Sequence, residues 1–214
     1  MIAEVVHQAN ETDTSESNTT KRRFTIEEYG RLVETGILNA GERVELVEGE
    51  IFVMGAINVA HAATVRRLIQ LLLPTLSPGI VLDAQNPIRL PGESLLQPDV
   101  VLLQPRPDLY ADDHPGVESL LLVIEVSDTT LRYDRSTKGV LYAAAGIREY
   151  WIVNLSGRQL EVYREPSPYG YRNMTILSAE DAVAMLALPD FTLSVAAILG
   201  TEPWAGNVAE AEER

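Results

Sequence analysis

The segment Leu120-Leu121-Leu122-Val123-Ile124-Glu125-Val126-Ser127 is apolar from Leu120 to Val126 apart from one carboxylate. A short run with so little polar alternation favours a strand that is covered on both faces, as in the centre of an α/β sheet. Residues 99–103 form a second run of this kind, headed by Asp99. The sequence therefore predicts two central strands, each with one acid near an end.

Working outward, the pattern predicts an α/β fold in which a mixed β-sheet is flanked by helices, preceded by an N-terminal helix and a hairpin. Thr25 and Glu28 form a capping box for a helix over 25–35. Apolar residues on both sides of a Glu48-Gly49 turn predict a hairpin over 44–54. Further helices are expected over 60–73, 134–145 and 192–199, and shorter strands over 79–83, 87–90, 150–153, 160–164 and 171–177.

Length and composition fit one domain, because 214 residues with 46% apolar content can bury a single sizeable core. We expect a disordered acidic tail over 1–20, one domain over 21–200 and an acidic tail over 201–214. The sequence has no apolar run long enough to cross a membrane and no secretory signal, so a cytoplasmic location is expected. Without cysteine, carboxylates and histidines remain as metal ligands.

The net charge of −14 argues against a protein that covers nucleic acid with a broad basic face. Half of this charge lies in the two ends, because residues 1–20 hold four acids and no base, and residues 201–214 hold four acids and one base. Screening at physiological salt acts over about 8 Å. A local basic rim around a cleft is therefore compatible with the composition.

Glu125 is the most unusual of these acids, since a buried carboxylate without a partner is costly. It could form a salt bridge to a buried Lys or Arg, or reach water at the strand end. Asp99 could be a simple strand-start residue after Pro98. If both carboxylates lie about 4 Å apart, they repel by about 4 kcal/mol at an effective dielectric of 20. A hard cation, Mg²⁺ or Mn²⁺, would relieve this repulsion, and so would a shared proton.

Lys138 is the third candidate, because Asp134, Lys138 and Tyr142 recur at helical spacing directly after the Glu125 strand. Asp134 and Lys138 could equally form a surface ion pair of a few tenths of a kcal/mol. Near the two acids, the ammonium could stabilise charge on a phosphate in the transition state. Tyr142, Tyr150 and Trp151 are expected to pack in the core or to stack on bases.

Several spaced motifs together resemble the Uma2 family, also known as DUF820, of restriction endonuclease-like proteins. They are Pro98-Asp99, 124–127, Asp134, Lys138, Tyr142, Gly146-Ile147 and 149–153, with 45–50 and His61 in the N-terminal half. The resemblance covers roughly residues 24–200. It implies a PD-(D/E)xK nuclease fold, in which two acids and a lysine work with Mg²⁺ on phosphodiesters.

On this resemblance Asp99 and Glu125 are the metal-binding acids. Ser127 occupies the usual lysine position, so the lysine is expected from the following helix as Lys138. Glu45 matches an early acid that often completes the metal site in related nucleases, although it could also be an edge-strand charge facing water. His61 is a further candidate, and a lone histidine at a helix start is more often a capping or packing residue.

The leading hypothesis is therefore a Mg²⁺- or Mn²⁺-dependent endonuclease that acts on nucleic acid, most readily DNA, with Asp99, Glu125 and Lys138 as catalytic residues. A homodimer would suit double-strand cleavage, because two-fold DNA favours two-fold proteins. One alternative is a nuclease-like binding or assembly module without catalysis, suggested by Ser127 and the acidic balance. Another is a carboxylate-dyad hydrolase of other substrates, whose activity would be insensitive to chelators.

Overall fold

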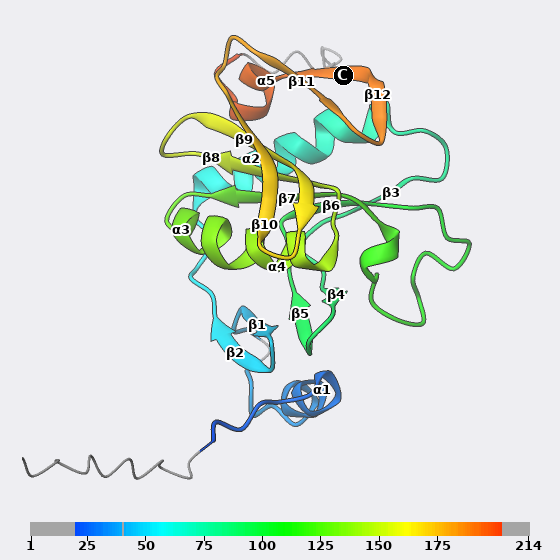
Figure 1. Cartoon of the computed structure of the whole chain (residues 1–214), viewed down its shortest axis with the longest axis vertical. Coiled ribbons are helices and arrows are strands. Elements are labelled where there is room, and N and C mark those ends of the chain that lie inside the picture. The colour runs from blue at the N-terminus through cyan, green and yellow to red at the C-terminus, as the bar shows by residue number, and fades with distance from the viewer. Residues whose placement is uncertain (1–19, 40, 203–214) are drawn as a thin grey trace, which may run out of the picture.

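The protein is described here from a computed structural model that covers residues 20–39 and 41–202 (Figure 1). The two tails expected at the chain ends lie almost wholly outside these described residues. A six-stranded sheet in the order β10-β9-β8-β7-β6-β3 forms the centre, and it is mixed because β7 and β8 run parallel while the other neighbours run antiparallel. Its strands are β3 (Val81–Asp83), β6 (Val100–Leu103), β7 (Leu120–Ser127), β8 (Glu149–Asn154), β9 (Gln159–Ser167) and β10 (Gly170–Leu177).

Both predicted central strands, β6 and β7, are interior strands of this sheet and pair with each other. Side chains of a strand alternate between the two faces. In β7, Leu122, Ile124 and Val126 accordingly belong to one core cluster and Val123 to another. The alternation places Glu125 and Ser127 on the face of Val123.

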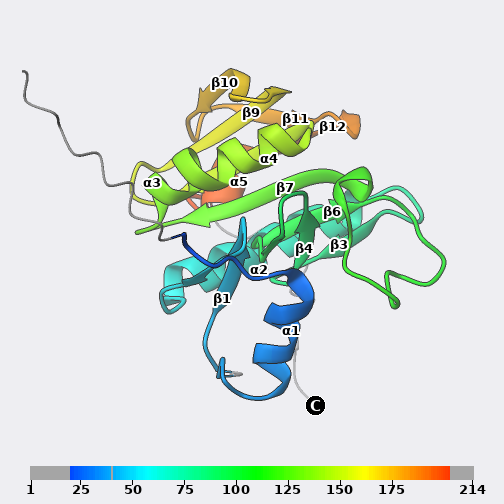
Figure 2. The same cartoon turned by 60° about the horizontal axis from the view of Figure 1, so that its bottom comes forward.

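Helices cover both faces of the sheet, and Figure 2 shows β7 with α4 over one face and α2 under the other. The face of Leu122 packs against Leu68 and Leu72 of α2, and α5 joins the same core. The opposite face packs against Tyr142 of α4. The helical elements are α1 (Ile26–Glu34), α2 (Val59–Leu72), η1 (Leu73–Thr75), η2 (Val117–Ser119), α3 (Leu131–Tyr133), η3 (Asp134–Lys138), α4 (Gly139–Ala145) and α5 (Val195–Leu199).

A second sheet, in the order β2-β1-β5-β4, lies between the central sheet and α1 (Figure 1). Its strands are β1 (Val44–Val47), β2 (Glu50–Val53), β4 (Ile88–Leu90) and β5 (Ser94–Leu96). Tyr29 of α1 packs against Leu46 and Leu95 of this sheet, and its hydroxyl donates to the Val44 carbonyl. The predicted Thr25/Glu28 capping box is present at the start of α1.

The structure corrects several predicted bounds. The helix predicted over 134–145 begins at Leu131 and passes through a π-helical turn, η3, before it ends at the left-handed Gly146. Residues 192–194 belong to strand β12 (Leu188–Ser194), which pairs with β11 (Ala182–Met185), so the last helix is shorter than predicted. The strands β5, β11 and β12 were not predicted. Among the described residues, no helix is long and apolar enough to span a membrane.

Candidate active site

The two acids of the central strands lie at the same end of the β6–β7 ladder. In the antiparallel register Val100 lies opposite Ile124, so continuing the ladder by one residue sets Asp99 opposite Glu125. Both side chains are buried, with 3% and 4% of their residue surface exposed. Asp99 Oδ2 accepts a hydrogen bond from the Val126 backbone N–H at 2.8 Å, which fixes its carboxylate at the end of the ladder.

Lys138 contacts Glu125 directly and lines the same pocket as Asp99. Its Nζ donates to Glu125 Oε1 at 2.9 Å and to Glu45 Oε1 at 2.8 Å. The Tyr142 hydroxyl donates to the same Glu125 oxygen at 2.8 Å. The structure therefore gives Glu125 the buried lysine partner that the sequence left open, and it adds Glu45 to the same cluster.

The π-helical turn η3 explains how Asp134 and Lys138 both face inward. The Gly139 N–H donates to the Asp134 carbonyl five residues earlier, which widens the helix locally, and such turns frequently occur at functional sites. Asp134 accepts hydrogen bonds from the hydroxyls of Ser127 at 2.5 Å and Thr130 at 2.6 Å. The expectation of a surface ion pair between Asp134 and Lys138 is wrong, because both residues are 2% exposed and Lys138 pairs with other acids.

Glu45 is a buried residue of β1, with 1% of its surface exposed, so the edge-strand reading is wrong. Its Oε1 also accepts from the Gln97 N–H at 3.0 Å, whereas its buried Oε2 has no hydrogen-bond partner among the described residues. A buried acceptor without a partner is costly, so this oxygen is available to a further donor or cation.

His61 lies in the first turn of α2, and its Nε2 is 2.8 Å from Asp99 Oδ1. The capping role falls to Asn58, whose side chain accepts from the His61 N–H at 2.9 Å. His61 therefore contacts one oxygen of the Asp99 carboxylate while the Val126 N–H contacts the other, and the two together orient it. The residue that caps α2 is Asn58 and not His61.

Burial dominates the ionisation of this cluster. It raises the pKa of Glu125 well above its usual range, Lys138 lowers that pKa, and the Asp99 carboxylate raises it again. Burial alone would lower the pKa of Lys138, but the carboxylates of Glu125 and Glu45 more than offset it, so the pKa is raised and the ammonium keeps its proton. The pKa of Asp134 is raised mainly by burial.

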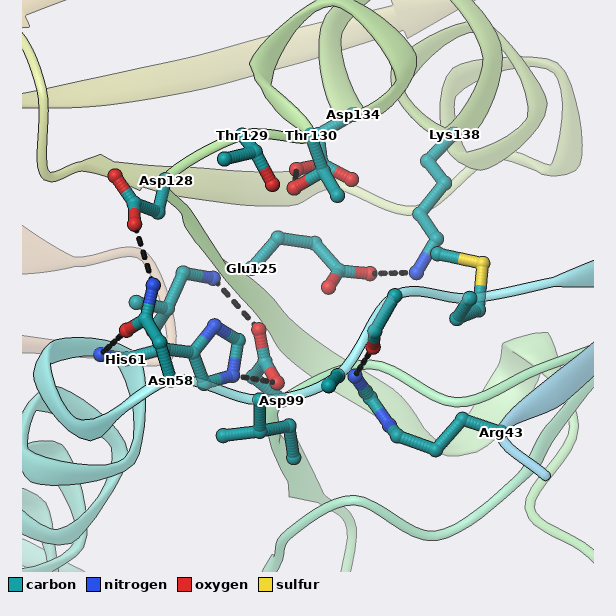
Figure 3. Close-up of a pocket in the computed structure, with 15 residues that line it drawn as sticks. Arg43, Asn58, His61, Asp99, Glu125, Asp128, Thr129, Thr130, Asp134 and Lys138 are labelled. Atoms are coloured by element: carbon teal, nitrogen blue, oxygen red, sulfur yellow. Dashed lines mark hydrogen bonds and ion pairs between the residues drawn. The ribbon is translucent and has the colours of Figure 1, made fainter.

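His61, Asp99, Glu125, Asp134 and Lys138 line one pocket, with a cavity of about 50 Å³ (Figure 3), whereas Glu45 is not among its lining residues. The strand β7, the helix α2 and the turn η3 each contribute to it. Sequence reasoning missed several lining residues, although an Asn before an apolar helix is a recognisable N-cap signal. The missed residues are Arg43, Asn58, Asp128, Thr129 and Thr130.

Among the described residues, the pocket offers carboxylate oxygens to a hard cation but no complete set of protein ligands. Four buried carboxylates, those of Glu45, Asp99, Glu125 and Asp134, lie in this cluster with one lysine ammonium, which contacts two of them, so the buried acids outnumber the buried lysine. Glu125 Oε2 accepts no hydrogen bond from the part of the chain that the structure describes. In that same part, no group of three or more His, Asp or Glu residues is arranged to hold a metal. Mg²⁺ can bind through one or two carboxylates while keeping several waters, so Asp99 and Glu125 suffice chemically.

The aromatic residues near the site are core residues. Tyr142, Tyr150 and Trp151 are fully buried, and Tyr142 meets Tyr150 edge to face at 5.0 Å between ring centroids. They are therefore not free to stack on bases in this structure.

Comparison with known proteins identifies the family. The Uma2 model, described as "Putative restriction endonuclease", matches residues 26–196. The chain belongs to the Uma2 family. This confirms the resemblance seen in the sequence, and Uma2 membership supports a nuclease and hence a hydrolase.

A solved structure of a similar fold supports the architecture. The chain is similar to a putative nuclease belonging to DUF820 from Anabaena variabilis ATCC 29413, with 15% identity, a TM-score of 0.65, and coverage of 83% of this chain and 98% of that one. It also matches the type IIG restriction endonuclease BpuSI with 13% identity and a TM-score of 0.34, over 66% of this chain and 15% of that one. No curated protein matches the chain. The expected nuclease-like α/β fold is confirmed.

Proposed function

We propose that this Uma2 protein is a metal-dependent endonuclease that hydrolyses phosphodiester bonds in DNA. The observation that carries the proposal is the contact of the Lys138 ammonium with the Glu125 carboxylate, in a pocket that Asp99 also lines. An ammonium and two acids at one pocket are what phosphodiester hydrolysis needs, and Uma2 membership supports nuclease chemistry.

The residues would divide the work as follows. Asp99 and Glu125 would hold Mg²⁺ or Mn²⁺, which when bound supplies a water of lowered pKa and offsets the charge of the substrate. Lys138 would donate to the phosphate oxygen on which charge develops. His61 keeps the Asp99 carboxylate oriented, while Glu45 holds the Lys138 ammonium at 2.8 Å.

The direct test is nicking of supercoiled plasmid DNA by the purified full chain. We expect nicking that requires Mg²⁺ or Mn²⁺ and that falls by about two to three orders of magnitude or more in Asp99→Asn and in Glu125→Gln. Circular dichroism of both variants checks that the fold survives. Absence of cleavage of DNA and RNA with either metal would refute the proposal.

A second candidate, a binding or assembly module without catalysis, is favoured by one observation. Glu45 and Glu125 both form ion pairs with the Lys138 ammonium, so its charge is already compensated within the protein. Ser127, at the usual lysine position, donates a hydrogen bond to Asp134. A structural network of this kind could serve stability alone.

Lys138→Met, combined with Glu45→Gln, separates the two candidates, because the pair removes an ammonium and one of its buried counter-charges together. An enzyme should lose nicking by about 10²-fold or more in this double variant even where its melting temperature is retained. A module should keep its DNA affinity without metal, as measured by isothermal titration.

A further inference from the structure

A second pocket lies beside the active-site pocket, on the other side of the first turn of α2. It has a volume of about 340 Å³ and is formed by α2, the turn that joins β8 to β9, and the residues that end α5. Four of its contributors are polar or charged side chains with donors, namely Thr64, Arg67, Arg158 and Thr201.

The charge of this pocket is positive. Arg67 and Arg158 both line it, and within the described residues neither forms a salt bridge or a side-chain hydrogen bond. The nearest acid along the chain on the α5 side is Glu202, whose carboxylate accepts from the Ser194 hydroxyl at 3.4 Å. Two guanidinium groups without acceptors thus face one pocket in a protein of net charge −14.

The Arg67 guanidinium lies close to Gly200. A Cβ atom at position 200 would lie 2.2 Å from Arg67 Cζ, so the absence of a side chain there makes the room for the guanidinium. Gly200 also has a φ of +70°, as the left-handed residue that ends α5. Arg67 is therefore partly buried and positioned, which reduces the entropy lost when it binds an anion.

This second pocket is connected to the active-site pocket through neighbouring residues. Ala60 lines the second pocket and His61, the next residue, lines the first. Across the β8–β9 turn, the Ser156 hydroxyl donates to the Asp128 carbonyl at 3.0 Å, and Asp128 lines the first pocket. The six residues from His61 to Arg67 advance about 9 Å along the helix axis, a short step along a nucleic-acid strand.

We propose that this second pocket binds a backbone phosphate of the nucleic acid, next to the phosphodiester in the active-site pocket, through Arg67 and Arg158. The proposal rests on the proposed nuclease function, and it adds the path that the nucleic-acid strand takes across the protein. Arginine suits this role because its planar fork can donate two hydrogen bonds to one phosphate. Such a local basic site also explains how an acidic chain can hold a polyanion.

The test is DNA binding in EDTA, measured by fluorescence anisotropy with a short fluorescein-labelled duplex and the full chain carrying Glu125→Gln. This background removes cleavage and one repelling charge, so binding is read separately from hydrolysis. In it, Arg67→Ala and Arg158→Ala should each weaken binding by about 10-fold, and the double variant should lower the slope of log K against log salt by about one.

Arg172→Ala is the matched control, because Arg172 is an exposed arginine of β10 that lines neither pocket. It should change the affinity by less than about 2-fold. Arg158→Lys should retain the salt slope while losing part of the affinity, since it keeps the charge and loses the fork. Arg158 is exposed, so its variants test the proposal even if Arg67→Ala is unstable.

Three results would overturn the proposal: no measurable DNA binding, an equal loss in the Arg172→Ala control, or unchanged or tighter binding in the pocket variants. Tighter binding would mean that the arginines serve carboxylates of a protein segment instead. Failure of the nuclease function alone would appear differently, as wild-type protein that binds DNA through these arginines and does not cut it.

Discussion

At the scale of single residues, the pKa values of two buried carboxylates are shifted in opposite directions. Glu125 is buried with a raised pKa, whereas Glu161 on β9 is also inaccessible to solvent and has a lowered one. Burial raises the pKa of Glu161 as well, but hydrogen bonds from Arg135, Tyr163 and Asn154 more than reverse it. The difference is that Glu161 is surrounded by donors, while Glu125 shares its one ammonium with another acid.

These two carboxylates should therefore respond to pH with opposite signs. A raised folded-state pKa costs stability at pH values above it, and this cost disappears as the pH falls through the folded-state pKa toward the unfolded value of about 4.3. The stability of the wild type relative to Glu125→Gln should consequently rise as the pH falls from about 8 toward about 5.

Glu161→Gln is the control with the opposite expectation. A lowered pKa contributes stability above the unfolded value, which is lost as the pH falls through the folded-state pKa. This variant should therefore melt below the wild type at about pH 8. Thermal unfolding of the wild type and both variants across this pH range is the measurement. A difference in melting temperature between the wild type and Glu125→Gln that does not change in this direction with pH would contradict the argument.

At the scale of elements, the hairpin of β1 and β2 matters because it carries Glu45 into the cluster. Its turn uses Glu48 and Gly49, both with positive φ. A Cβ on Gly49 would lie 2.7 Å from Arg23 Cβ and 3.0 Å from the Phe24 carbonyl oxygen. The turn therefore needs glycine for its conformation and also for the chain segment packed against it.

Gly49→Ala should destabilise the protein by about 2 kcal/mol or more, because left-handed strain and the close contacts add. Gly92→Ala is the matched control, since Gly92 has a similar φ of +77° and no atom within 4 Å of the added Cβ. That control should cost about 1 kcal/mol. Urea unfolding of both variants gives the comparison, and equal losses would refute the packing contribution.

Some of these elements could be predicted from the sequence and others could not. β6, β7 and α1 follow from local signals, namely unbroken apolar runs and a capping box. The strands β5 and β11, of three and four residues, are too short for any periodicity to emerge. The π-helical turn η3 could not be predicted, because the i, i+4 spacing of Asp134 and Lys138 is equally compatible with an ordinary α-helix.

The candidate site was also predictable only where a local sequence signal marks a residue. Glu125 was evident as a charge in an apolar run, and Asp99 as the acid that heads the neighbouring strand. The contacts of Glu45 with Lys138 and of His61 with Asp99 join residues 93 and 38 positions apart, and no local pattern encodes them. Arg67 gave no signal, because its setting depends on Gly200 at the far end of the chain.

At the scale of the whole molecule, the excess of buried acids over the buried lysine predicts that a cation stabilises the fold. Mn²⁺ at about 100 times its dissociation constant should contribute about 2.7 kcal/mol, which corresponds to a rise of about 5 to 10 °C in melting temperature for a chain of this size. Asp99→Asn should abolish this rise. Asp112→Asn, at an exposed acid away from the pocket, should retain it.

Differential scanning fluorimetry of the three proteins with and without Mn²⁺ makes this measurement without any substrate. A rise that persists in Asp99→Asn would place the ion elsewhere. The homodimer expected for double-strand cleavage stays a prediction, which sedimentation of the full chain would test.

The contact of Lys138 with Glu45 has a consequence for how the protein assembles. It ties the small N-terminal sheet to the helix that follows β7 across 93 residues of chain, and closing so long a loop costs entropy before the contact can stabilise anything. The ammonium should therefore be captured late in folding, after both sheets have formed. During synthesis on the ribosome, a chain with such an order of events carries no completed active centre until most of its length has emerged.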